Sequence, residues 1–470
     1  MKQNQIDPVP YISALMDRAR KAQKIAEGFS QQKVDELAAA ITWEIVANDD
    51  VVKELAQVSF DECRLGDVAS KIAKVSVKCR GVFHDVKSVK TVGIVEEIPE
   101  RGLARITKPV GVVGSLVPST QADMHPLIQA IFAVKARDAI VFSPHPRGKL
   151  TTMKTVNLIR EVMKKYEAPE DLFISIEEPS IPKTNELMKQ CDLVMATGGQ
   201  PMVKAAYSSG TPAYGVGAGN AIIVIDKTAD LADAALKIKA SKVFDLAAGC
   251  SCDNSVVIDE AVYADMISEF KKIGAHLLNK DEKEKLKKTI WPNWPDDHII
   301  NRDVVASPVG NIAGLACLSI PEDTAFLLVE EDKTGEASPF SGEKMSLVTS
   351  VYKSKNIEDA IRIINQNHEY SGAGHSCGVF SKTPEHIEKV ALETYTTRVV
   401  VNQSQAATNT GSWVSGMPFT SSLGCGTWGG NIASENIVLK HYMNNTWVIR
   451  EIPSRQPTDE ELFSGFTPRQ

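Results

Sequence analysis

Short, uninterrupted runs of apolar and β-branched residues are the feature that most constrains how this chain can fold. They lie at residues 110–117 (VGVVGSLV), 139–143 (AIVFS), 193–196 (LVMA) and 221–225 (AIIVI). Runs of this kind are typical of strands that are buried on both faces of a parallel sheet. Residues 127–135 and 150–165, between these runs, have apolar residues at helical spacing. The alternation predicts an α/β protein with βαβ crossovers and a doubly wound parallel sheet.

The alternation occurs twice, which predicts two α/β lobes. The 470 residues exceed the roughly 250–300 at which a single hydrophobic core stops growing. A second round of buried strands starts near Ala221, so we expect a first lobe at residues 1–225 and a second at 226–438. Residues 439–470 are predicted to form a small β arm, and residues 291–343, rich in Pro, Asp and Gly, to be irregular. The other expected elements are helices at 12–25, 34–45, 231–242, 262–273 and 357–367, and strands at 92–97, 103–108, 172–176, 255–258, 347–352, 377–381 and 399–402.

Composition and charge exclude several classes of protein. The formal charge is −7 and the pI about 5.8, so no broad basic face is available to bind nucleic acid. The eight cysteines are scattered and form no C-x-x-C pair, so zinc ribbons are excluded and no metal site is expected. No run of 18 apolar residues could span a membrane, and the first residues lack the apolar core of a secretory signal. We therefore expect a soluble protein of the cytoplasm.

Four glycine-rich segments are the candidate sites. They are residues 196–199 (ATGG), 207–220 (YSSGTPAYGVGAGN), 247–255 (AAGCSCDNS) and 411–431. Glycine at this density is costly in conformational entropy and is usually retained for a ligand site or a close backbone crossing. The small residues around Cys250 leave its sulfur accessible and close to backbone N–H groups, which lower a thiol pKa and receive an oxyanion. Cys252 is the main rival of Cys250 as the functional thiol.

Taken together and in this order, these segments resemble the CoA-acylating branch of the aldehyde dehydrogenase superfamily. The matching pieces are residues 108–120 (KPVGVVGSLVPST), 142–147 (FSPHPR), 196–220, 249–255 (GCSCDNS), 342–344 (GEK), 371–376 (SGAGHS) and 423–436 (LGCGTWGGNIASEN). They cover the chain nearly end to end. The resemblance implies that a cysteine thiolate attacks an aldehyde and that a hydride passes to NAD or NADP. Coenzyme A, as co-substrate, then takes the acyl group from the resulting thioester.

The resemblance also assigns roles to individual residues. Cys250 matches the nucleophile, and Gln121 stands where relatives usually carry an asparagine that helps to hold the oxyanion. The expected residues at the adenosine of the cofactor are Ser143, Pro144 and His145. Those at its phosphates are Thr197, Gly198 and Gly199, and the residue expected at a ribose is Glu343.

One absence indicates which acceptor takes the acyl group. Hydrolytic relatives carry a glutamate some thirty residues before the cysteine, as the base for a deacylating water. The matching residues 215–220 (GVGAGN) contain no carboxylate, which favours CoA over water. His375 is a candidate for assisting the CoA thiol. Two alternatives stay open: a hydrolytic enzyme that makes a free acid, and a redox-sensing or binding module built on Cys250 and Cys252.

The substrate is constrained less than the reaction. Two departures from the pattern of relatives concern which aldehyde is used. They are Gln121 and the Asp253–Asn254 pair, which stands where many relatives have Glu–Gln. Residues 402–422 are most similar to sulfoacetaldehyde-type and other short-chain members, with acetaldehyde as the alternative. The neutral donors in this segment that would suit a small polar or anionic group are Ser404, Gln405, Asn409, Thr410 and Ser415.

The resemblance further implies a homodimer or homotetramer, in which a strand at 446–452 is a plausible arm across a dimer. The expected partners are the aldehyde and CoA, with no nucleic acid and no membrane. The start of the chain lacks the amphipathic targeting peptide of microcompartment-housed relatives, which favours free cytoplasm. The choice between NAD and NADP and the physiological direction stay open.

Overall fold

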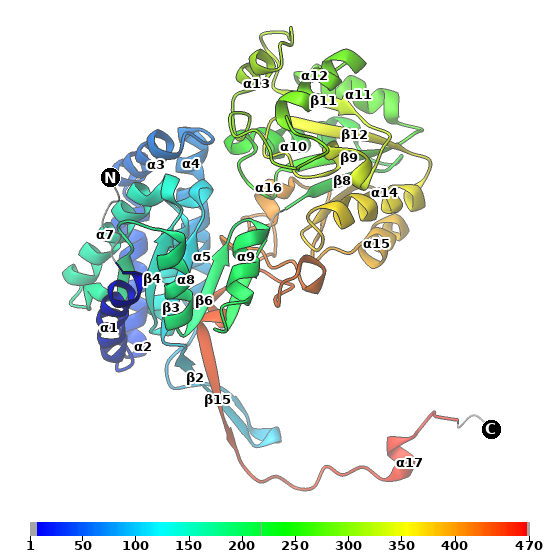
Figure 1. Cartoon of the computed structure of the whole chain (residues 1–470). Helices are drawn as coiled ribbons and strands as arrows, with labels where there is room; N and C mark the ends of the chain where they lie inside the picture. The colour runs from blue at the N-terminus through cyan, green and yellow to red at the C-terminus, as the bar shows by residue number, and fades with distance from the viewer. Residues whose placement is uncertain (1–6, 218, 468–470) are drawn as a thin grey trace.

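Three β-sheets organise the chain in the computed structural model, which describes residues 7–217 and 219–467. Two of the sheets are parallel, and each forms the centre of an α/β lobe. Figure 1 shows the lobes side by side, with the third sheet and an extended C-terminal tail projecting away from them. The predicted fold class, two α/β lobes plus a small β arm, agrees with this arrangement of sheets.

The first lobe is built on a parallel sheet with the strand order β5-β4-β3-β6-β7. Its strands are β3 (Val112–Val117), β4 (Ala139–Pro144), β5 (Phe173–Ser175), β6 (Leu193–Thr197) and β7 (Ala213–Val216). The chain runs outward from β3 to β5 and then returns to the other side of β3 at β6. The order therefore reverses between β3 and β6, and ligands bind at the carboxyl ends of strands at such a switch point.

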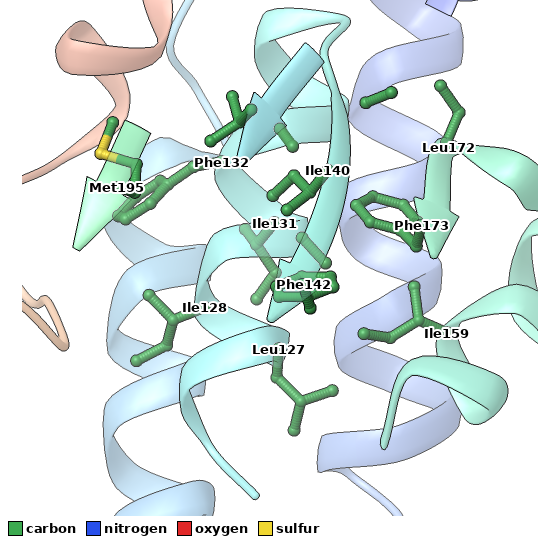
Figure 2. Close-up of a cluster of buried hydrophobic side chains, with 14 of the residues drawn as sticks. Leu127, Ile128, Ile131, Phe132, Ile140, Phe142, Ile159, Leu172, Phe173 and Met195 are labelled. Carbon is green, nitrogen blue, oxygen red and sulfur yellow. The ribbon is translucent and has the colours of Figure 1, made fainter. Parts of the chain in front are cut away.

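Helices cover both faces of this sheet. They are α1 (Pro8–Ala26), α2 (Gln31–Ile41), α3 (Asp49–Cys63), α4 (Val68–Lys74), α5 (Arg80–Val86), α6 (His125–Ala136), α7 (Lys149–Lys165), α8 (Ile181–Gln190) and α9 (Gln200–Tyr207). Figure 2 shows Ile131 of α6 beside Phe142 of β4, and Phe132 of α6 beside Met195 of β6, in the core. All twelve residues of α6 are buried, which explains why most of its sequence is apolar.

The second lobe is built on a parallel sheet with the order β10-β11-β12-β9-β8-β13-β14. Its strands are β8 (Ala221–Ile225), β9 (Asp253–Asp259), β10 (Ala275–Leu277), β11 (Phe326–Glu330), β12 (Val348–Ser354), β13 (Cys377–Phe380) and β14 (Val399–Val401). Its helices are α10 (Leu231–Val243), α11 (Tyr263–Lys272), α12 (Lys280–Ile290), α13 (Val309–Leu315), α14 (Ile357–Tyr370), α15 (Pro384–Glu393) and α16 (Gln405–Thr408).

Two details of the second lobe differ from the sequence-based expectation. Strand β8 pairs with β9 and β13, so the sheets change between Val216 and Ala221, one strand before the predicted boundary at residue 225. The region 291–343, predicted to be irregular, contains the buried strand β11 and helix α13. The proline and aspartate residues in the loops around β11 led to the prediction of an irregular region, and β11, with only five residues, was not recognised as a strand.

The third sheet is antiparallel and joins β2 (Leu103–Pro109) to β1 (Ile94–Ile98) and to β15 (Met443–Ile449). The chain returns to the first lobe before it reaches β15, since the Tyr442 ring packs 5.5 Å from that of Phe132. Beyond β15 the chain extends as an exposed tail with the short helix α17 (Asp459–Leu462). Within the described residues, no helix is both long enough and apolar enough to cross a membrane.

Candidate active site

The predicted site residues lie where one edge of the first sheet meets one edge of the second. Ser143 and Thr197 stand at the carboxyl ends of β4 and β6. Cys250 and His375 instead precede β9 and β13, at the amino ends of those strands. A hydrogen bond of 2.8 Å between the hydroxyls of Thr197 and Ser422 ties the end of β6 to the C-terminal segment. The candidate site is therefore assembled from the carboxyl edge of one parallel sheet and the amino edge of the other.

The turn that carries Cys250 follows a strained stretch of backbone. Asp245, Leu246 and Ala247 all have positive φ angles, of 49°, 50° and 62°. Left-handed backbone is unfavourable for residues other than glycine, and such outliers persist where the surroundings over-determine them. Here the surroundings belong to the first lobe, because Asp245 forms a buried ion pair with Lys74 of α4. The Asp245 carboxylate also accepts the Asp67 N–H at 3.1 Å, and its own N–H donates to Ser70 Oγ at 3.0 Å.

Glycine allows the loop before β8 to lie directly against Cys250. A Cβ atom on Gly219 would stand 2.3 Å from the Cys250 carbonyl oxygen and 2.7 Å from its Cβ. On the other side, a Cβ on Gly372 would stand 2.4 Å from that of Asn220. The expectation of a close backbone crossing in this segment is confirmed at Gly219, whereas a Cβ on Gly217 would meet only the Gln200 side chain, 3.5 Å away; Ala218 lies outside the described residues.

His375 contacts the Cys250 thiol. Its Nε2 lies 3.3 Å from Cys250 Sγ, and its Nδ1 lies 2.9 Å from Ser376 Oγ. The Ser376 hydroxyl in turn accepts from Asn409 Nδ2 at 3.0 Å. A cysteine beside an imidazole that is itself oriented by a third group is the arrangement that activates a nucleophile. Sequence analysis named Cys250, His375 and Asn409 separately, and the structure brings them into one chain of contacts.

Burial keeps both members of this pair neutral. It raises the pKa of the Cys250 thiol to about 12, with the neighbouring Glu343 acting in the same direction. Burial, followed by the positive charge of Arg398, lowers the pKa of His375 to about 3. The imidazole is therefore an uncharged proton acceptor at neutral pH. Burial also raises the pKa of Glu343 to about 8, so that most of this carboxyl carries a proton at pH 7.

Arg398, which sequence analysis missed, is a buried cation beside this pair. Its guanidinium donates to the His375 and Gly424 carbonyls, both at 2.7 Å, and to Asn436 Oδ1 at 3.1 Å. All three partners are uncharged, so the positive charge of Arg398 is available to stabilise a thiolate at Cys250. The signal was present in the sequence, because a charged residue comes directly before the buried run of β14.

The residues predicted to bind the cofactor lie on either side of the switch point of the first sheet. The Ser143 hydroxyl contacts that of Thr184 at 2.7 Å, and His145 Nδ1 accepts the Arg147 N–H at 3.1 Å. Gly198 and Gly199 follow β6, and Gly199 is the N-cap residue of α9. A strand end, a glycine turn and the start of a helix at a switch point fit the adenosine and phosphates of a dinucleotide. Pro144 ends β4, and Glu343 lies near Cys250.

Cys250 opens into a narrow cavity of about 60 Å³. Gln121, the predicted oxyanion donor, lines this cavity, and within the described residues its Oε1 atom has no hydrogen-bond partner. Of the five polar residues predicted in the segment 402–422, Thr410 alone lines the cavity. Lys74 and Lys78 also line it, although sequence analysis did not single them out. Lys74 and Lys78 follow Lys71 by three and seven residues, a spacing that places all three lysines on one face of a helix. This spacing was the signal in the sequence that could have identified them.

Three further residues singled out in the sequence, Asp253, Asn254 and Cys252, have their side chains in contact with other parts of the protein. Asp253 accepts from Gln405 Nε2 at 3.0 Å, and Asn254 Nδ2 donates to Asn220 Oδ1 and to the Gly342 carbonyl. Neither Asp253 nor Asn254 lines the cavity, so their departure from the pattern of relatives bears on the loops and not on substrate contact. Cys252 does line the cavity, but it is buried in the core of the second lobe, with its thiol directed at the Phe244 carbonyl, 3.8 Å away.

Comparison with known proteins gives consistent matches. The aldehyde dehydrogenase family model matches residues 11–288. A sulfoacetaldehyde dehydrogenase from Acholeplasma sp is 42% identical over 96% of this chain and 93% of its own length. An acylating sulfoacetaldehyde dehydrogenase from Bilophila wadsworthia is 41% identical over 97% of this chain and 98% of its own. The solved structure of an acetylating aldehyde dehydrogenase from Geobacillus thermoglucosidasius superposes with a TM-score of 0.92 at 32% identity, covering 97% of this chain and all of that one.

Substituting Gly219→Ala tests the close crossing at Cys250. The added methyl group would meet the Cys250 backbone, so the thiol must shift. Because displacements of about 1 Å can cost roughly 100-fold in rate, we expect aldehyde oxidation to fall by about that factor. Gly314→Ala is the matched control, since a Cβ there meets nothing within 4 Å. Equal activity of the two variants would show that the crossing does not position the thiol.

The pH dependence of Cys250 alkylation tests the neutral resting state. A thiol with a pKa of about 12 is almost wholly protonated at pH 7, and only the thiolate reacts. In the cofactor-free protein we expect the rate of labelling by iodoacetamide to rise about tenfold per pH unit from pH 7 to 10. Mass spectrometry follows Cys250 separately, with the exposed Cys317 as an internal reference for the reagent. A rate that levels off below pH 8 would contradict the assigned state.

Proposed function

Because this chain belongs to the aldehyde dehydrogenase family, we propose that it is a CoA-acylating enzyme that acts on a short-chain aldehyde of the sulfoacetaldehyde type. It oxidises the aldehyde with NAD(P)⁺ and transfers the acyl group to CoA, giving acyl-CoA and NAD(P)H. The observation that carries the proposal is the contact of 3.3 Å between Cys250 Sγ and a neutral His375, beside a loop, residues 215–220, whose sequence has no carboxylate.

In the first step Cys250 is the nucleophile and His375 the base. His375 Nε2 takes the thiol proton as Cys250 Sγ bonds to the aldehyde carbon, and the carbonyl oxygen becomes an oxyanion. The amide of Gln121, which lines the same cavity, donates to this oxygen. The positive charge of Arg398 lowers the cost of the negative charge that passes from sulfur to oxygen.

The cofactor fits along the strand ends described above. Ser143, Pro144 and His145 hold its adenosine, Thr197, Gly198 and Gly199 its phosphates, and Glu343 a ribose. A nicotinamide bound there would supply the acceptor for the hydride of the carbon attached to Cys250. The acyl group then remains on Cys250 as a thioester.

The residues around the thioester favour CoA as the acceptor. Glu343, the carboxyl near Cys250, is mostly protonated at pH 7 because of its raised pKa, and so it is a poor base for activating water. After hydride transfer His375 releases to solvent the proton that it took from Cys250. The neutral imidazole then accepts the proton of the CoA thiol as that sulfur attacks the thioester, and Cys250 leaves as the thiolate. A thioester exchanges readily with a second thiol, so the step is reversible.

The substrate and the assembly follow from two further observations. Two relatives that are 41% and 42% identical over nearly their whole length are named for sulfoacetaldehyde, which supports that aldehyde over acetaldehyde as the proposed substrate. Strand β15 lies at the edge of its sheet and exposes Trp447 and Ile449. An exposed apolar edge strand is a template for pairing with another chain, so we place β15 across a homodimer or homotetramer in the cytoplasm.

NADH formation with and without CoA tests the reaction. With sulfoacetaldehyde and acetaldehyde as substrates, we expect sustained turnover only when CoA is present. Cys250→Ala should reduce turnover to background, whereas Cys252→Ala should still form NADH in a CoA-dependent reaction. Absorbance at 340 nm follows the reaction, and mass spectrometry detects the acyl-CoA. Sustained turnover without CoA would mean that water deacylates the enzyme, and equal loss in both cysteine variants would favour the redox module.

Removal of the imidazole tests the base. His375→Ala should lower kcat by roughly 100- to 10,000-fold, the range for loss of a general base. Imidazole added to the solution should restore part of the rate in this variant and leave the unmodified enzyme unchanged. Circular dichroism checks that the variant is folded. A folded variant with more than half of the normal activity would remove His375 from the mechanism.

A further inference from the structure

Three lysines occupy one buried helical face next to the candidate site. Lys71, Lys74 and Lys78 lie on α4 and the π-helical turn that follows it, Val75–Cys79. The side chain of Lys74 is 12% exposed, and Lys71 and Lys78 are 0% and 9% exposed. Lysine is almost never buried to this extent without a partner, because removing a charge from water is costly. Each of these lysines therefore calls for a specific reason to be buried.

Lys74 and Lys78 have different partners. Lys74 forms the ion pair with Asp245 and also donates to the Thr120 carbonyl at 3.1 Å. Lys78 Nζ donates to the Ala407 and Gly411 carbonyls at 3.0 and 2.6 Å, and lies 5.7 Å from the centre of the Phe419 ring. Within the described residues, no carboxylate lies within 4.0 Å of Lys78 Nζ. An ammonium group has three donors, so one N–H of Lys78 has no partner in this set.

The cavity at Cys250 carries a net positive charge. Its wall contains the lysines 74 and 78 and a single carboxylate, Asp245, which is already paired with Lys74. The hydroxyl residues Thr410 and Ser421 belong to the same wall. Burial lowers the pKa of Lys78 to about 8, as expected for a cation that lacks a counter-charge. A bound anion would supply that counter-charge.

We propose that Lys78, with the hydroxyls of Thr410 and Ser421, forms the subsite for an anionic group, sulfonate or carboxylate, carried by the aldehyde. The cavity is narrow, about 60 Å³, so that group and the carbonyl at Cys250 are separated by only a few bonds. Lys78 thereby selects short anionic aldehydes over neutral aldehydes of similar size. This inference rests on the proposed function, because it needs Cys250 to be the acylated residue.

Kinetic discrimination between charged and neutral aldehydes tests the subsite. Lys78→Met keeps the length and apolar character of the stem and removes the charge. We expect kcat/KM for sulfoacetaldehyde to fall about 100-fold, as for loss of a hydrogen bond between charged groups, and kcat/KM for acetaldehyde and propionaldehyde to change by less than about threefold. Succinic semialdehyde, which carries a carboxylate, distinguishes the two anions. Lys53→Met, on the surface, is the matched control.

Three results would overturn the subsite. They are equal losses for charged and neutral aldehydes in Lys78→Met, no loss for either class, and an unmodified enzyme that prefers acetaldehyde to both anionic aldehydes. Equal losses would mean that Lys78 supports the loop at Ala407 and Gly411 and not the substrate.

Protection of Cys250 from alkylation tests the subsite without requiring turnover. Ethanesulfonate should slow labelling of Cys250 by iodoacetamide in the unmodified protein at least tenfold more effectively than methanesulfonamide, its neutral analogue. The protection should be lost in Lys78→Met. Protection without CoA-dependent NADH formation would refute the proposed function and leave an anion site, whereas CoA-dependent turnover without protection would refute the subsite alone.

Discussion

The buried ion pair between Lys74 and Asp245 is the contact on which the site depends. It joins α4 of the first lobe to the turn that carries Cys250 in the second. Three successive left-handed residues precede this turn, at a cost of about 1–3 kcal/mol each. The hydrogen bonds that Asp67 and Ser70 make to Asp245 come from the same part of the first lobe and offset this cost. The position of the nucleophile is thus determined by residues some 180 positions earlier in the sequence.

The charges around Cys250 explain how a half-buried thiol can react. Burial keeps the resting thiol protonated, and the buried cations Arg398 and Lys78 have only uncharged partners within the described residues. Neutral protein atoms accept hydrogen bonds from both groups but leave their positive charge uncompensated. Arg398 is placed to stabilise the negative charge that appears on sulfur and then on the aldehyde oxygen, and Lys78 to receive an anionic group of the substrate.

The sequence predicted most of the fold and part of the site, for identifiable reasons. Apolar runs gave β3, β4, β6 and β8, because strands buried on both faces need continuous apolar sequence. Strand β11 was missed because four apolar residues followed by a glutamate, between polar loops, carry little periodicity. The motif around Cys250 was local and could be recognised, whereas the contribution of Lys78 depends on a contact between segments more than 300 residues apart. No local pattern reports such a contact, although the lysine spacing was visible in the sequence.

The joint between the lobes also has a consequence for biosynthesis. Residues 66–74 leave the ribosome well before Asp245 and Cys250, so the partner that shapes the nucleophile turn is already made when that turn is synthesised. The reactive thiol acquires its geometry only when the second lobe docks on the first. A nascent or half-folded chain thus exposes an ordinary cysteine. The Cys250 thiol gains the contacts of the active site only after the two lobes have docked.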